Sequence, residues 1–452
     1  MLSSTLCYKE KEKYFLLFFS VYLFLGLVGT FYNNIVDFRF DLFYDTDPSI
    51  KYNLIFMNTL TDLDRHPFVF VMTPILRLLS FITQEPKLAF LLFQAAIATL
   101  NNFLLFKILR KININFSTSV LFTLIYAFSF STLLFVSFPE IYLYSPLIGL
   151  ILVYYILGVK KEQLSVFNTI KDMLPVLVIS FLCILGFGIN LINIVLYIPL
   201  LIYFFSLSSH KIRKDAILTF IFSGLIFYSF LTLCGEIFFP FLSALITTSS
   251  ILNYRALDWV MVDFSTQRFI QVLRESLIAP FYALETYFNL NKSGWWFSKE
   301  QSIFLLFPFF ILAFFPFFKK VQSVPKIIYY FGAIIMLHLI LNYFYNSTWF
   351  LYSQNYLFFL VIILSYFYSK ITHPIKNIIL MMFLSFEIIF NIMMLGLFYF
   401  ALNTNLIDVL VDALGKVLLI DVIIVCFYFI IKLLKGIMIQ TQFKFYNKEN
   451  KT

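Results

Sequence analysis

The run PFVFVMTPILRLLSFI, residues 67–82, decides how the rest of the chain is arranged about a membrane. It is apolar, yet it has only 16 residues, is interrupted by Pro74 and carries Arg77. A helix needs about 20 apolar residues to cross the hydrocarbon core of a bilayer. If this run crossed, every later loop would change sides, so its placement has to be decided together with that of the other apolar runs.

The amino-acid composition predicts the class of protein. Hydrophobic residues make up 61% of the 452 residues, charged residues make up 13%, and Phe occurs 62 times. A water-soluble domain has no interior that could hold so much apolar surface. Repeated apolar runs of about 18 residues or more are typical of membrane-spanning helices, so we expect an all-α, polytopic membrane helix bundle.

Twelve runs are candidate transmembrane helices, which puts both termini on the same side of the membrane. They lie near 14–35, 88–107, 116–136, 141–157, 173–189, 191–206, 217–236, 303–318, 327–344, 356–369, 377–400 and 417–433. This map divides the chain into an N-terminal transmembrane module (1–236), an outer loop (237–302) and C-terminal transmembrane helices (303–452). The N-terminal module contains the first outer loop, at 36–87.

The basic residues test this map, because cytoplasmic loops of membrane proteins are enriched in Lys and Arg. With the N-terminus in the cytoplasm, 22 of the 33 basic residues fall in inside segments, and every inside segment holds some. A crossing at 67–82 would move these loops outside, so we predict that this run is an amphipathic juxtamembrane helix on the outer surface. The net charge of +9 then reflects cytoplasmic loops and not a nucleic-acid partner. The predicted location is the plasma (inner) membrane, with both termini in the cytoplasm.

Acidic and basic side chains gather in the first outer loop. The segment DFRFDLFYDTDPSIKYNLIFMNTLTDLDRHPF, residues 37–68, holds six Asp residues together with Arg39, Lys51, Arg65 and His66. Any single Asp could simply form a turn or a cap, as YDTDPS does. As a cluster between a span and a surface helix, these residues favour a functional site.

The two ends of this cluster resemble the GT-C glycosyltransferases, multi-span enzymes that use polyprenyl-phosphate-linked sugars. Asp45 and Asp47 in YDTDP match the acidic motif of the family, and Arg65 and His66 in DRHPF match the basic residue or His that precedes its prolines. The family usually has two prolines where this chain has one. A narrower similarity, to bacterial GT-C-like membrane proteins of unassigned function, covers roughly residues 40–150.

The resemblance implies transfer of a sugar on the outer face of the membrane. A carboxylate takes the proton of the acceptor hydroxyl, which is the role expected of Asp45 or Asp47. Arg65 and His66 would stabilise the phosphate of a polyprenyl-phosphate sugar at headgroup depth. The acceptor would be a lipid-linked glycan, a lipid or a protein of the cell envelope. No resident cofactor is expected, and a divalent cation stays an open alternative because GT-C enzymes differ in their use of metals.

The other outer segments hold further candidates. Glu140, in SFPEIYLYS, matches a supporting acid of the GT-C pattern, although the Pro-Glu pair could simply begin a helix. Arg255 could bind the donor phosphate or reach lipid headgroups. Tyr352 and Gln354 lie in a polar and aromatic segment, 346–356, of the kind that binds sugars.

The second long outer loop is expected to contain another surface helix, in DFSTQRFIQVLRESLIAPF. Its apolar residues recur at helical spacing, with polar residues on the other side. The apolar side holds Phe269, Ile270, Leu273 and Leu277.

Glu387 is the strongest argument for a different function, because it interrupts the predicted span 377–400. An acidic residue inside a membrane is a functional hypothesis by default. It could couple protons in a transporter or form a hydrogen bond between helices. The alternatives to a glycosyltransferase are therefore a transporter or flippase of lipid-linked sugars, or an outer-face glycan polymerase. The gathering of charges outside and the absence of a convincing internal repeat favour the glycosyltransferase.

Overall fold

The computed structural model is a bundle of helices, and no strand occurs among the residues that it describes. These residues are 16–29, 69–137, 141–160, 169–190, 193–238, 266–278, 280–281, 309, 311–313, 324–344, 349–373, 375–402, 416 and 420.

Helices occupy the predicted spans that fall in this part of the chain. The helix Leu16–Gly29, α5 (Pro86–Lys111), and the pair α6 (Phe116–Phe128) and α7 (Phe130–Ser137) correspond to the first three. The later long helices are α8 (Tyr144–Ile156), α9 (Ile170–Ile189), α10 (Asn193–Leu207), α11 (His210–Phe238), α15 (Lys326–Phe344), α16 (Trp349–Ser369) and α17 (Ile375–Leu402). The shorter elements are η4 (Val69–Met72), α4 (Thr73–Thr83), η5 (Ile141–Leu143), α13 (Thr266–Leu273) and the π-helical turn η9 (Arg274–Ile278).

Five of the described helices are long and apolar enough to cross a membrane, or six if the bent pair α6–α7 forms one span. Other apolar helices, such as α8 and α10, are shorter. The chain is thus an integral membrane protein with a polytopic helical bundle, as the composition predicts. The number of twelve spans stays a prediction.

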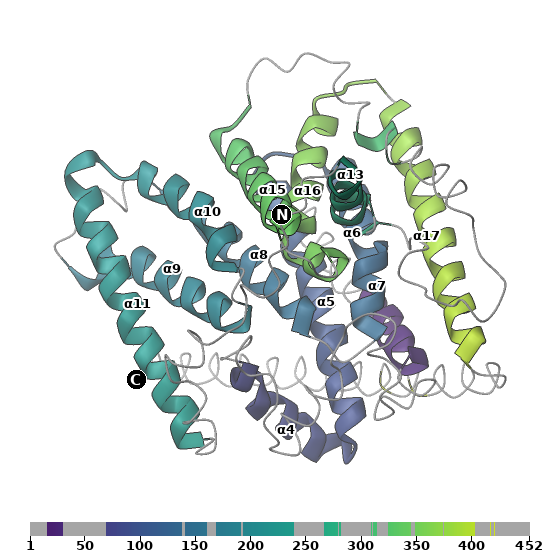
Figure 1. The fold of residues 1–452 in the computed structure, drawn as a ribbon, viewed down its shortest axis with the longest axis horizontal. Coiled ribbons are helices and arrows are strands. Elements are labelled where there is room, and N and C mark those ends of the chain that lie inside the picture. The colour runs from purple at the N-terminus through teal and green to yellow at the C-terminus, as the bar shows by residue number, and fades with distance from the viewer. Residues whose placement is uncertain are drawn as a thin grey trace, which may run out of the picture.

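Figure 1 shows the bundle as a broad array, with α11 along the left edge and α17 along the right edge. Between them, α9 packs on α11, α10 packs on α15, and α15 packs on α16. On the other side of the array, α6 packs against both α16 and α17. α4 lies at the lower edge of the view, opposite the ends at which α11 and α17 begin.

Basic side chains cover helix ends on the side of the bundle opposite α4. The ammonium group of Lys111 donates to the carbonyl of Tyr154, at 3.0 Å, and lies 4.2 Å from the centroid of that ring. The guanidinium group of Arg213 donates to the carbonyls of Phe205 and Ser208 where α10 ends. Cations are favourable at the carbonyl ends of helices, so these contacts stabilise the ends of α8 and α10. The assignment of this side to the cytoplasm stays a prediction.

The described part of the apolar run at 67–82 forms η4 and the short helix α4 and not a transmembrane helix. α4 has 11 residues, about 16 Å, which is half the thickness of the hydrocarbon core. Pro74 lies in its first turn, where a missing N–H group costs nothing. Gln84 then adopts a left-handed conformation, with φ of 55°, and Pro86 begins α5. Its position on the outer surface of a membrane stays a prediction.

A close contact of a glycine gives the first test of the fold. In the α9–α10 hairpin, a methyl group at Gly186 would lie 2.6 Å from the ring of Tyr197. Gly186→Ala is therefore expected to lower the free energy of unfolding by about 1–3 kcal/mol, since the core has to move to admit the methyl group. Thermal unfolding in detergent measures this. Gly332→Ala is the matched control, because nothing lies within 4 Å of the added atom, and equal losses in both variants would contradict the packing described.

Candidate functional site

Most of the residues that the sequence assigns to the site lie outside the described part of the chain: Asp45, Asp47, Arg65, His66, Glu140 and Arg255. Their roles stay predictions. The structure describes the backbone of Tyr352 in α16 but not its side chain, and it describes Gln354 in full. The site is therefore built from the elements that flank the predicted residues in the chain.

Gln354 is fully buried and holds two helices together. Its Nε2 donates to the hydroxyl of Thr132 at 2.9 Å, and its Oε1 accepts from the hydroxyl of Ser131 at 3.4 Å. These bonds link α16 to α7. They give Gln354 a structural role in the bundle, and its predicted contact with substrate stays a prediction.

α4 has one face packed on the bundle and one face exposed. Leu76 is fully buried and packs with Phe90 of α5, whereas Phe81 is 75% exposed. Ile75, Leu78 and Ile82 are also at least half exposed. An exposed apolar face on a short helix beside long membrane helices is typical of a helix that lies in the membrane interface.

Phe93 of α5 has contacts both with the α4–α5 hairpin and with the start of α8. Met72, the last residue of η4, and Phe93 of α5 pack against the same pair, Leu76 and Phe90. The ring of Phe93 also lies 5.6 Å from that of Tyr144, the first residue of α8. A single α5 side chain thus connects the turn after DRHP to the helix after SFPE.

The chain limits how far the predicted residues can lie from this junction. His66 precedes Met72 by six residues and Glu140 precedes Tyr144 by four. At about 3.5 Å per residue, His66 lies within about 21 Å of Met72, and Glu140 within about 14 Å of Tyr144. The predicted phosphate-binding pair and the predicted supporting acid therefore precede elements that pack on neighbouring parts of α5, and their own distance stays a prediction.

The start of α8 lies beside the middle of α5 and not beside the end at which α5 begins. The side chain of Asn101 donates to the carbonyl of Leu143, 3.0 Å away, just before α8 begins. Asn101 is 15 residues after Pro86, about 22 Å along the helix axis. The hydroxyl of Ser145 donates to Asn193 at 2.8 Å, and Asn193 donates to the carbonyl of Gly186 at 2.9 Å. We call these contacts, made by Asn101, Leu143, Ser145, Gly186 and Asn193, the recessed polar layer.

The third predicted span is broken. α6 and α7 meet at Ser129 with a bend of 54°. The hydroxyl of Ser129 donates back to the carbonyl of Tyr126 at 2.8 Å, which competes with the helical hydrogen bonds there. A break in a membrane helix is stable only where other groups satisfy the freed backbone atoms.

A segment from the predicted second long outer loop supplies those groups. The backbone N–H groups of Phe130 and Ser131 donate to the carbonyls of Phe281 and Pro280, at 3.3 and 3.0 Å. Upstream, the hydroxyl of Tyr356 donates to the carbonyl of Ser276, and Asn342 donates to the Ser276 hydroxyl at 3.0 Å. We call residues 276–281 the inserted segment, because its described side chains reach into the bundle.

The expected helix in this region is present as α13 and η9. Phe269 and Ile270, on the predicted apolar side, are more than half exposed, whereas Val272, Ser276 and Ile278 are buried. The buried side chains are those that face α7, α15 and α16, contacts that the local sequence does not indicate. The position of the helix on a membrane surface stays a prediction.

Asn391 of α17 forms hydrogen bonds both to the end of α6, at the break, and to the inserted segment. Its Nδ2 donates to the carbonyls of Phe128 and Phe281, at 2.9 and 2.7 Å. One turn earlier lies Glu387, which is fully buried and has no hydrogen-bond partner among the described residues. Polar residues within apolar runs were the signal by which Asn101, Asn193 and Asn391 could have been found in the sequence.

Replacing Asn391 tests this fastening. Asn391→Leu removes two hydrogen bonds between membrane helices, each contributing about 0.6–1.7 kcal/mol, so we expect a loss of about 1–3 kcal/mol in unfolding free energy. Unfolding of the chain in mixed micelles measures it. Met393→Leu, at a 44% exposed position of the same helix, is the control and is expected to change little. Equal stabilities of the two variants would show that Asn391 does not hold the break.

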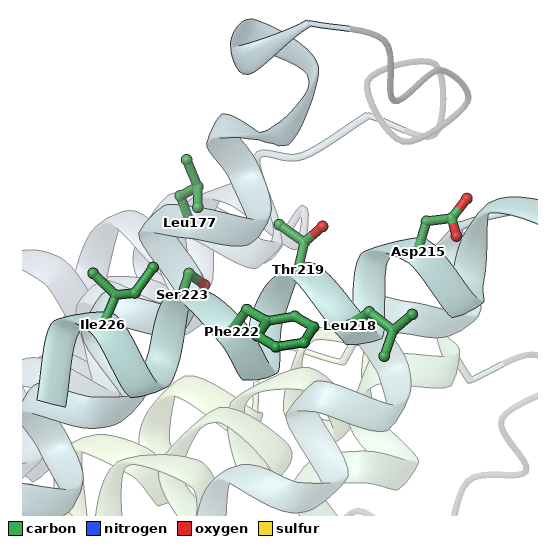
Figure 2. A pocket seen from close by; sticks show the side chains of 7 residues that line it. All are labelled: Leu177, Asp215, Leu218, Thr219, Phe222, Ser223 and Ile226. Atoms are coloured by element: carbon green, nitrogen blue, oxygen red, sulfur yellow. The ribbon is translucent and has the colours of Figure 1, made fainter. Parts of the chain in front are cut away.

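The structure also has a groove on one flank, between α9 and α11 (Figure 2). It has a volume of about 390 Å³ and is lined mainly by α11, with Leu177 of α9 on the other wall and Asp215 at one end. None of the predicted site residues lines it. Within the described ranges, no group of three His, Cys, Asp or Glu side chains could hold a metal ion.

No family model, no curated protein and no solved structure matches the chain.

Proposed function

We propose that the chain is a membrane glycosyltransferase of GT-C type, which moves a sugar from a polyprenyl-phosphate donor to a cell-envelope acceptor on the outer face of the membrane. One observation supports the proposal: Phe93 packs on the same Leu76–Phe90 pair as Met72 of η4, which follows DRHP, and its ring also lies 5.6 Å from that of Tyr144, the first residue of α8, which follows SFPE. Elements that follow two motifs about 75 residues apart in the sequence thus pack on the same part of α5.

The exposed face of α4 supports a lipid-linked donor. A polyprenyl phosphate keeps its phosphate at the depth of the headgroups. A helix with an exposed apolar face, such as α4, is expected at the same depth, and Arg65 and His66 precede α4 in the chain. In the proposed reaction these two side chains stabilise the departing phosphate, and Asp45 or Asp47 takes the proton of the acceptor hydroxyl. Glu140 supports the acceptor. The recessed polar layer offers amide and hydroxyl groups below the junction.

Transfer from a labelled donor tests the proposal. The full chain in nanodiscs is given polyprenyl phosphates that carry radiolabelled hexoses or pentoses, with a lipid extract of the envelope as acceptor. We expect release of polyprenyl phosphate and movement of label into the acceptor fraction. Intact donor lipids in every reaction, with no labelled product, would contradict the proposal.

A transporter or flippase of lipid-linked sugars is the second candidate, because two observations favour it. α6–α7 is a broken membrane helix, and Glu387 is a buried acid next to it. Both features are common at the substrate sites of transporters. Movement of the labelled lipid between leaflets of sealed vesicles, without cleavage of its phosphate ester, would favour this function over transfer.

The placement of α4 can be tested separately. Spin labels or fluorophores at Phe81→Cys and Leu78→Cys are expected to be quenched by a quencher on lipid headgroups or upper acyl chains. Their side chains are 75% and 59% exposed in the structure. Lys160→Cys, after the end of α8, is the control and is expected to be reached by a water-soluble reagent only from the cytoplasmic side. Labels at 78 and 81 that are reached only from water would contradict a helix in the interface.

A further inference from the structure

One face of α17 is closed off from the surroundings and the other is open. Met382 and Ile389 are 68% and 67% exposed, as expected for side chains that face lipid. The buried residues recur every three or four positions: Leu380, Phe383, Glu387, Asn391 and Leu395. Glu387 therefore faces the interior of the bundle and not the lipid.

Phe281 of the inserted segment touches α17 on both sides of Glu387. Its ring centroid lies 6.1 Å from that of Phe383, and its carbonyl accepts from Asn391 at 2.7 Å. Glu387 is one helical turn from each of these residues, and side chains at this spacing share a face. The carboxyl group thus faces the place where the inserted segment enters the bundle.

No cationic side chain meets Glu387 from the described elements packed on this face. Neither carboxyl oxygen has a hydrogen-bond partner among the described residues. α6 and α7 contain no Asp, Glu, Lys, Arg or His, and Tyr126 is their only titratable residue. Positions 280 and 281 are Pro and Phe, and the side chains of Arg274 and Glu275 in η9 lie outside the described residues.

The backbone carbonyl oxygens beside the Glu387 face of α17 already accept hydrogen bonds from other groups. The carbonyl of Phe128 accepts from Asn391, and that of Phe281 accepts from both Asn391 and the Phe130 N–H. No cage of free oxygens for a metal cation is formed by these groups. An ionised carboxylate here would face carbonyl oxygens in an apolar interior, which is strongly unfavourable.

We propose that Glu387 is a proton-binding site, and that the bound proton keeps the inserted segment seated between α7 and α17. The proton comes from water and returns to water, so no other reactant is needed. When it leaves, a negative charge arises one turn from the Phe383 and Asn391 contacts with Phe281, and the segment is repelled. Proton binding and seating of the segment then stabilise each other, because coupling of two equilibria is reciprocal. The inference does not depend on which reaction the protein performs.

The sign of the pH dependence follows from this linkage. The segment is seated while Glu387 holds its proton, and it opens as the pH rises through the range in which the proton is lost. Over the range in which the seated form keeps the proton and the opened form loses it, opening becomes about tenfold more frequent for each pH unit, since one proton is released on opening. Glu387→Gln keeps the shape and has no proton to lose at this position, so its opening is expected to be independent of pH.

Hydrogen exchange of the full chain in nanodiscs measures opening directly. The protection of residues 266–281, corrected for intrinsic exchange, is compared between the natural chain and Glu387→Gln over a pH series. We expect a fall in protection with rising pH in the natural chain and a constant protection in the variant. The same pH dependence in both proteins, or none in the natural chain, overturns the proposal.

A chemical probe identifies the proton itself. Dicyclohexylcarbodiimide reacts with protonated carboxyl groups in apolar surroundings, so the peptide with Glu387 is expected to be labelled more at low pH than at high pH. Glu387→Leu is expected to leave the thermal midpoint unchanged or raised. If Glu387 is instead ionised and paired with a cation such as Arg274, labelling fails and Glu387→Leu lowers the midpoint strongly. That result also overturns the proposal.

Discussion

Replacing both Asp45 and Asp47 by Asn is expected to lower the rate of sugar transfer by about 10²–10⁴-fold, the range that a positioned general base contributes. Asn keeps the size and polarity of Asp but does not accept a proton from the acceptor hydroxyl. The two positions are changed together because each could take over from the other at a distance of two residues. Transfer of labelled sugar in nanodiscs, at saturating donor, is the measurement.

The control for this prediction comes from the same loop. Asp62 and Asp64 adjoin Arg65 and His66 and are expected to orient them, so Asp62→Asn with Asp64→Asn should have a smaller effect on the rate. Both double variants remove two negative charges from one loop. If the rate is unchanged when Asp45 and Asp47 are replaced, the assignment of the base is wrong.

Replacing Arg65 and His66 by Ala is expected to reduce transfer by about 10²–10³-fold, as loss of a group that stabilises developing negative charge does. The donor phosphate gains charge as its bond to the sugar breaks. A cation at headgroup depth stabilises that charge, and η4 begins only three residues after His66. The measurement is the rate of release of polyprenyl phosphate as a function of donor concentration.

Two further variants make this test specific. Arg77→Ala removes a cation from the exposed side of α4 and is expected to change the rate little, because Arg77 belongs to α4 and not to the motif. Arg65→Lys keeps the charge but loses the planar fork, so partial activity is expected. Equal losses for Arg77→Ala and for the Arg65 and His66 pair would indicate attraction of anionic lipid in general.

The sequence predicts the short helix after DRHP because length and charge decide against a crossing. Only 16 residues are available at 67–82, and α4 contains ten of them together with Thr83. Pro74 was taken as an interruption and instead lies in the first turn of the helix. The apolar runs likewise predict the helices α5, α9, α11, α15 and α17, since each run is long enough to indicate a membrane-spanning helix without information from the rest of the chain.

The break at Ser129 and the inserted segment were not predictable in the same way. The sequence around Ser129 has no Pro or Gly, and its apolar run continues through the bend. The break depends on partners about 150 and 260 residues later, at Pro280 and Asn391. Hydrophobic periodicity records local preference and contains no information about such pairings, so the span at 116–136 reads as one straight helix.

The residues of the candidate site could be predicted from the sequence only in part. Their charge and the resemblance to GT-C enzymes placed the acids, the Arg65–His66 pair and Glu140 in the predicted outer segments. The sequence did not indicate Phe93 as the side chain that joins their flanking elements, because a Phe in an apolar run looks like any other lipid-facing or core residue. Burial and ring contacts distinguish it only in three dimensions.

The capping of α7 by Pro280 and Phe281 also sets an order of assembly during synthesis. About 150 residues must be added between Ser131 and Pro280, which takes roughly 7–30 s at about 5–20 residues per second. Until then the N–H groups of Phe130 and Ser131 have no such partners, so the newly inserted third span is expected to leave the translocon as an unbroken helix. The bend would then form only after the second long outer region has been made, and premature release of a truncated chain would leave that helix straight.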